Sequence, residues 1–142
     1  KSAQVDAANP RDKNSFGHII EIKEDSGDHG AQRGTWSILV RCGDPAVAEV
    51  GAVWNPDTSE NGWFGSPDNA AMDAQGRLWV STDQGRNWSK TGKSDGLYGV
   101  ETEGAARGTS KIGFAYISKS PDRYNAPIFA SFIIYWEKLP VT

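Results

Sequence analysis

Apolar and polar residues alternate over several short stretches of this chain, as they do in β-strands. Alternation with a period of two predicts strands over 18–24, 35–42 and 97–102. Two further strands are predicted near the C-terminus, over 111–117 and 128–136. No segment of ten or more residues repeats its apolar side chains at helical spacing, so no helix is predicted. The pattern therefore indicates an all-β fold.

The clearest local unit is a hairpin made of the strands 69–73 and 77–83. A tight turn ending in Gly76 joins them, and glycine adopts the positive φ angle that such a turn requires. Alternation in the second strand places Leu78 and Val80 on one face and the intervening side chains on the other. Hairpins of this kind recur in the blades of β-propellers.

Residues 81–88 read S-T-D-Q-G-R-N-W, which is close to the sialidase-type Asp box S-x-D-x-G-x-[ST]-W. Asn87 stands where that pattern has Ser or Thr. In an Asp box the Asp and Gly build a hairpin turn and the Trp packs behind it. The motif is structural, so it predicts a turn at this position and says nothing direct about catalysis.

Composition narrows the classes of function. The chain has 142 residues, enough for about one domain, and no apolar run approaches the roughly 20 residues that cross a bilayer. A net charge of -3 argues against a nucleic-acid-binding protein. Sixteen Gly and seven Pro indicate a loop-rich chain. Cys42 is the one cysteine, which excludes an internal disulfide, and its apolar neighbours predict a buried side chain.

The first candidate site combines Arg11 with Glu21. Arg11 follows Asn9-Pro10, and an arginine on a loop stiffened by proline is suited to hold a phosphate group through two parallel hydrogen bonds. Glu21 is the one charge inside an apolar strand, and if it points inward it needs a cationic partner or a metal ion. The residues alone equally allow a solvent-facing Glu21 and a solvated Arg11.

The second candidate site is Asp68-Asn69, directly before the predicted hairpin. Adjacent carboxylate and amide groups offer hard oxygen ligands, which suit calcium better than zinc. The alternative is an Asx turn, in which one of these side chains caps its own backbone.

Taken together, several blocks resemble the PhoX-type alkaline phosphatases. The first runs from Asp6-Ala7-Ala8-Asn9-Pro10-Arg11 through Gly17-His18-Ile19-Ile20-Glu21 to 24–29. The second is Trp63-Phe64-Gly65-Ser66-Pro67-Asp68-Asn69 with the hairpin after it, and the third is 95–98 with 102–108. The blocks keep the family's order from about residue 5 to about residue 110, and the pattern fades over 111–142.

This resemblance implies a secreted or periplasmic six-bladed propeller that uses iron and calcium ions to hydrolyse phosphate monoesters. Carried onto this chain, it implies that Arg11 is a catalytic residue contacting the substrate phosphate. It also implies that Glu21, Asp68 and Asn69 belong to the metal site. The expected partner is thus a phosphate-ester substrate, with neither a nucleic acid nor a membrane.

The chain is too short for a closed propeller, so we expect one domain, 1–142, with two to three blades' worth of antiparallel sheet. Its family segment is 1–110 and its divergent tail is 111–142. One alternative function is a non-catalytic binding or structural module, whose exposed sheet edges are covered by the tail or by forming a homo-oligomer. Another is a sialidase-like or lactonase-like propeller, which the Asp box and the hairpin sequence Asp73-x-x-Gly76-Arg77-Leu78-Trp79 favour.

Overall fold

The computed structural model describes residues 4–115, which form two antiparallel sheets. Three short 3-10 helices and one short α-helix lie between the strands. Within these residues no helix is long and apolar enough to cross a membrane. The strands are β1 (His18–Glu24), β2 (Gly34–Arg41), β3 (Pro67–Met72), β4 (Leu78–Thr82), β5 (Gly96–Val100) and β6 (Ser110–Ala115). The helices are η1 (Asp25–Gly27), η2 (Ala48–Val50), η3 (Gly85–Asn87) and α1 (Trp88–Thr91).

The larger sheet is a meander in which β3, β4, β5 and β6 lie in chain order and each strand pairs antiparallel with the next. A four-stranded meander is the architecture of one propeller blade. The prediction of an all-β, loop-rich, partly propeller-like chain is therefore confirmed. The described strands begin within two residues of the predicted positions, and β1 to β5 also end within two residues of them. The end of the strand predicted over 111–117 and the whole strand predicted over 128–136 lie outside the described residues.

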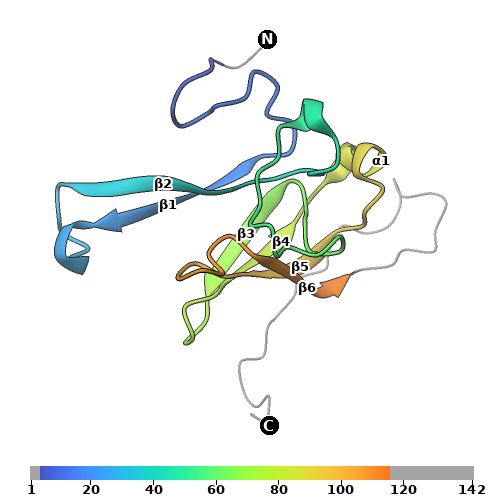
Figure 1. Cartoon of the computed structure of the whole chain (residues 1–142). Helices are drawn as coiled ribbons and strands as arrows, with labels where there is room; N and C mark the ends of the chain where they lie inside the picture. The colour runs from blue at the N-terminus through green and yellow to red at the C-terminus, as the bar shows by residue number, and fades with distance from the viewer. Residues whose placement is uncertain (1–3, 116–142) are drawn as a thin grey trace, which may run out of the picture.

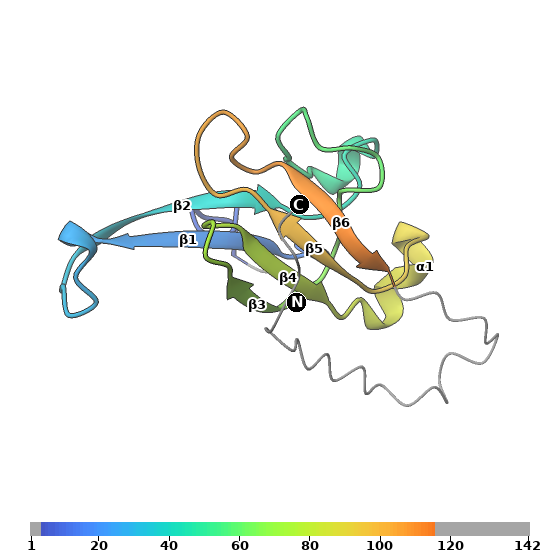
Figure 2. The ribbon, with the colours of Figure 1, turned by 90° about the horizontal axis from the view of Figure 1, so that it is seen from below.

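The smaller sheet is a two-stranded ribbon of β1 and β2. Its far end, which carries η1, projects away from the four-stranded sheet in both views (Figures 1 and 2). Cross-strand partners include Glu21 with Ser37 and Ile22 with Trp36. Because cross-strand partners share a face, Glu21 and Ser37 lie on one face and Ile22 and Trp36 lie on the other.

The core joins the base of the ribbon to the larger sheet. Phe64 is fully buried, and its ring centroid lies 4.9 Å from that of Trp54 and 4.7 Å from that of Tyr98. Such edge and tilted contacts add to the hydrophobic gain from burying the rings. Cys42 is fully buried in this core, as its apolar neighbours predicted. The remaining buried members are Phe16, Leu39, Val40, Val80 and Val100.

The hairpin between β3 and β4 forms as predicted, with Gly76 at a φ of 80°. Asp73 organises the turn, because its carboxylate accepts hydrogen bonds from Arg77 Nε at 2.8 Å and from Trp79 Nε1 at 2.9 Å. Burial by itself raises the pKa of Asp73, but these bonds and the backbone N–H donors of the turn outweigh it and lower the pKa to about 2. Val80 faces the core, as the alternation predicted.

The hairpin predicted from residues 81–88 forms, because β4 and β5 pair antiparallel, but η3 and α1 make its connection longer than the turn of an Asp box. The prediction that the chain has no helix is wrong at this point. Asp95 accounts for the longer path, because its carboxylate accepts hydrogen bonds from Thr82 Oγ1 at 3.0 Å and from the Gln84 backbone N–H at 2.8 Å. Trp88 is 39% exposed rather than packed behind a turn.

Candidate functional site

Arg11 lies on the N-terminal loop, and its side chain is buried against the base of the ribbon. Its NH1 group donates to the carbonyl oxygens of Cys42 at 2.8 Å and Val50 at 3.1 Å. Its NH2 group donates to Asn14 Oδ1 and to the carbonyl oxygen of Gly17. Burial is the main cause that lowers the pKa of Arg11. The guanidinium therefore joins three separate backbone segments to the loop that carries it.

The internal hydrogen bonds of Arg11 restrict how its guanidinium could contact a phosphate group. A guanidinium has four N–H bonds on its terminal nitrogens, and all four have acceptors inside the chain. The alternative of a solvated surface arginine is wrong, since Arg11 is only 8% exposed. Arg11 Nε is buried and has no hydrogen-bond partner among the described residues, so a two-point contact with phosphate through Nε–H and one terminal N–H would have to replace at least one existing bond. That role stays a prediction.

Glu21 has a cationic partner that is distant in the sequence. Its Oε2 accepts a hydrogen bond from Arg107 NH2 at 2.7 Å, and Lys23 Nζ lies 3.5 Å from Oε1. Arg107 NH2 also donates to Ser37 Oγ at 2.8 Å, on the same face of the ribbon. Burial raises the pKa of Glu21, but the hydrogen bond and charge of Arg107, helped by Lys23, lower it overall. The carboxylate is thus held ionised on the polar face.

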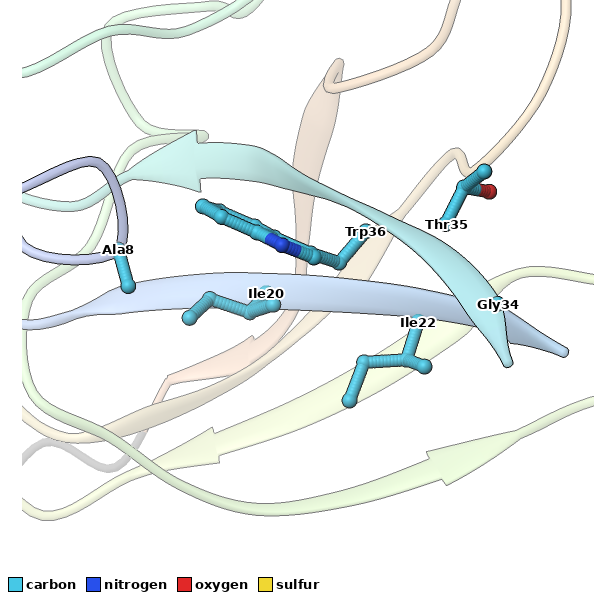
Figure 3. Close-up of a pocket in the computed structure, with 6 residues that line it drawn as sticks. All are labelled: Ala8, Ile20, Ile22, Gly34, Thr35 and Trp36. Atoms are coloured by element: carbon cyan, nitrogen blue, oxygen red, sulfur yellow. The ribbon is translucent and has the colours of Figure 1, made fainter. Parts of the chain in front are cut away.

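The opposite face of the ribbon is apolar. Figure 3 shows Ile20, Ile22 and Trp36 side by side there, with Ala8 of the N-terminal loop beside them. Ile22 is 71% exposed and Trp36 is 50% exposed. Glu21 therefore takes the polar side of a two-faced ribbon, where a cation can reach it, and its apolar neighbours in the sequence point the other way.

Asp68 and Asn69 are exposed on β3, an edge strand of the larger sheet. Asn69 Nδ2 donates to Asp68 Oδ2 at 2.6 Å. Consecutive side chains of a regular strand point to opposite faces, but the pairing of β3 with β4 is irregular between Pro67 and Ala70, and the two side chains meet there. Within the described residues, neither side chain makes the backbone hydrogen bond of an Asx turn.

The four predicted site residues do not form one cluster. Arg11, Glu21 and Asp68 make no hydrogen bond or ion pair with one another in the part of the chain that the structure describes. Over residues 4–115, no group of three or more His, Cys, Asp or Glu side chains is placed to hold a metal ion. The metal-site prediction for Glu21, Asp68 and Asn69 therefore stays a prediction.

Sequence reasoning missed Arg107, which lies 86 positions after Glu21. The sequence signal was the isolated Glu21 itself, because a charge between two isoleucines calls for a partner. Nothing in local spacing identifies which of the cations in the chain supplies it.

Two comparisons with known proteins found a match to this chain. A family model described as alkaline phosphatase PhoX matches residues 1–122. Among solved structures, the chain is similar to one described as "Pseudomonas fluorescens PhoX in complex with vanadate, a transition state analogue", with 25% identity and a TM-score of 0.63. The similarity covers 76% of this chain and 19% of that protein, so this chain spans about a fifth of its length. The search of curated proteins found no match. With most of its length matched, this chain belongs to the PhoX alkaline phosphatase family.

Proposed function

We propose that the chain contributes to the metal-dependent hydrolysis of phosphate monoesters as a segment of a PhoX-type propeller. The family match over residues 1–122 carries this proposal, because it includes both the loop of Arg11 and the strand of Glu21. The similar Pseudomonas fluorescens protein is described in complex with vanadate, a transition-state analogue, which supports phosphoryl chemistry. A periplasmic or secreted location is part of the same proposal.

The donor set fits hard metal ions. Asp68 and Asn69 present exposed oxygens, and the lowered pKa of Glu21 keeps its carboxylate ionised at neutral pH. Bound calcium and iron would supply positive charge to neutralise the phosphate and to activate a nucleophilic oxygen. For Glu21 to serve as a ligand, its carboxylate must leave Arg107, so a cation would replace the charge that Arg107 now provides.

Arg11 has two roles in this proposal. Its four internal hydrogen bonds fix the N-terminal loop against the base of the ribbon. Its contact with the substrate phosphate would use the unpartnered Nε–H and require at least one of those bonds to be exchanged, and the guanidinium would then stabilise the charge that spreads over the phosphoryl oxygens.

The test is hydrolysis of p-nitrophenyl phosphate by the full 142-residue chain, supplied with calcium and iron, together with elemental analysis of the purified protein. We expect metal-dependent turnover that Glu21→Gln reduces by about a hundredfold or more, in line with the loss of one electrostatic group from a reaction centre. Glu49→Gln is the matched control, because Glu49 is an exposed carboxylate outside the site. A chain that takes up neither metal and shows no turnover would contradict the proposal.

A second candidate function is a non-catalytic binding or structural segment. The observation in its favour is that Arg11 and Glu21 already have partners within the chain. A folded, metal-free protein without turnover would select this function. The sialidase or lactonase alternative rests on the Asp box and on the hairpin sequence that ends β3 and begins β4. The connection over 81–88 is longer than an Asp-box turn, whereas that hairpin forms as predicted, so this alternative stays a prediction.

A further inference from the structure

Arg41, at the end of β2, is a partly buried arginine. Its side chain makes no hydrogen bond or ion pair with any residue between 4 and 115. Arg11 lies close enough for the two positive charges to repel each other, and no carboxylate of the described chain pairs with either. Two cations held together without a counter-ion form a local positive site on an otherwise acidic chain.

His18 adds a neutral donor beside Arg41. The two residues are direct cross-strand partners at the base of the ribbon, so their side chains lie on the same face. The oxygen of the Asn14 amide accepts from Arg11, and therefore its Nδ2 group donates to His18 Nδ1 at 2.6 Å. A neutral imidazole whose Nδ1 accepts must carry its proton on Nε2, and this N–H has no acceptor among the described residues.

An open hollow lies next to Arg41. It has a volume of about 330 Å³ and runs between the N-terminal loop and β2. Arg41 is the charged residue in its wall, and the other lining residues are apolar: Ala7, Pro10, Ile38, Leu39, Val40 and Val53. A site of this composition matches a molecule with an anionic head and an apolar body.

We propose that Arg41 binds the phosphate group of a phosphate monoester whose apolar body rests in this hollow, with His18 Nε2–H as a second donor. The proposal rests on the proposed function for the identity of the anion as a phosphate ester. The guanidinium fork of arginine suits a phosphate because it can donate two parallel hydrogen bonds. Binding at this site needs no metal ion, which separates it from the metal-dependent centre proposed above.

The experiment measures binding of phenyl phosphate and inorganic phosphate to the full chain after dialysis against EDTA, by calorimetry or by NMR titration. We expect phenyl phosphate to bind, and Arg41→Gln to weaken its binding by about tenfold or more, as expected for a lost charge-assisted pair. Arg41→Lys keeps the charge without the fork, so it should weaken binding less. Arg33→Gln is the matched control, because it removes an exposed arginine near the far end of the ribbon and should leave binding unchanged.

Arg41→Gln removes no internal partner, so the variant should keep the fold, which the amide NMR spectrum checks. Binding that is equal in the wild type and in Arg41→Gln would overturn the proposal, as would the absence of binding to the metal-free wild type. Loss of binding in Arg41→Gln together with a lack of turnover when metals are supplied would support this site and contradict the proposed phosphatase function.

Discussion

The ion pair between Arg107 and Glu21 allows a quantitative test of how the ribbon is fixed to the rest of the molecule. Arg107 belongs to the segment between β5 and β6, and its NH2 group reaches Glu21 of β1 and Ser37 of β2. Arg107→Ala removes both hydrogen bonds at once. It also leaves the Glu21 carboxylate, which is only 20% exposed, with Lys23 as its remaining cation at 3.5 Å.

The magnitude follows from the environment of the pair. A hydrogen bond to a charged group contributes roughly 1.5–3 kcal/mol, whereas an exposed ion pair contributes about 0–1 kcal/mol. The two side chains are 32% and 20% exposed, which places the pair between these limits. We expect Arg107→Ala to lower the free energy of unfolding by about 1–2 kcal/mol at neutral pH. Arg33→Ala, at an exposed position, should change it by less than about 0.5 kcal/mol.

Urea unfolding of the wild type, Arg107→Ala, Glu21→Gln and the double variant gives the coupling energy between Arg107 and Glu21 as a double-mutant cycle. Arg33→Ala, with and without Glu21→Gln, is the control. The pH dependence follows from the lowered pKa of Glu21 in the folded state. Stability from this group is fully present above its ordinary value of 4.5 and is lost as the pH falls through the lowered folded-state pKa. The effect of Arg107→Ala should therefore shrink in acid. An equal loss of stability in the Glu21→Gln background, or one that does not change with pH, would refute this reasoning.

Three further predictions concern the fold. Asp73→Asn should reduce stability at neutral pH, and the difference should disappear in acid unfolding as the pH falls from 3.8 toward about 2, because the folded-state pKa is depressed. Phe64→Ala should lower the free energy of unfolding by about 3–5 kcal/mol in urea melts, since the ring is fully buried between two aromatic neighbours. Gly62→Ala should cost about 1–3 kcal/mol by the same measurement, because a Cβ at that position would collide with the carbonyl oxygen of Ser110. These assignments would be contradicted if Asp73→Asn were still less stable than the wild type in acid. Losses below about 1 kcal/mol for Phe64→Ala or Gly62→Ala would also contradict them.

Much of the fold could be predicted because its signals are local. The alternation around Val80 placed that residue in the core, and the turn at Gly76 was predicted from the conformational freedom of glycine. The Asp box, judged on residues 81–88 alone, indicated a hairpin but not the length of the connection between its strands. Asp95, which lies beyond the motif, accepts two hydrogen bonds from the segment and holds it in a longer path.

The candidate site was less predictable. The sequence indicated that an inward-pointing Glu21 would need a cation and that Arg11 is suited to hold a phosphate group, but it did not identify the groups around them. Arg107 reaches Glu21 across 86 positions, and the carbonyl oxygens that accept from Arg11 include those of Cys42 and Val50. These partners depend on which loops the packed core brings together.

The sequence by itself determined the strands, the tight turn before β4 and membership of the family, because alternation, turn chemistry and ordered motifs act between residues close along the chain. The tertiary structure alone decided which charges are paired and which are left unpaired. Packing of the ribbon base against the larger sheet enclosed Arg11 and brought Arg107 to Glu21, but it left Arg41 without a partner among residues 4–115. Such contacts form between segments that are distant in the sequence, so no local pattern specifies them.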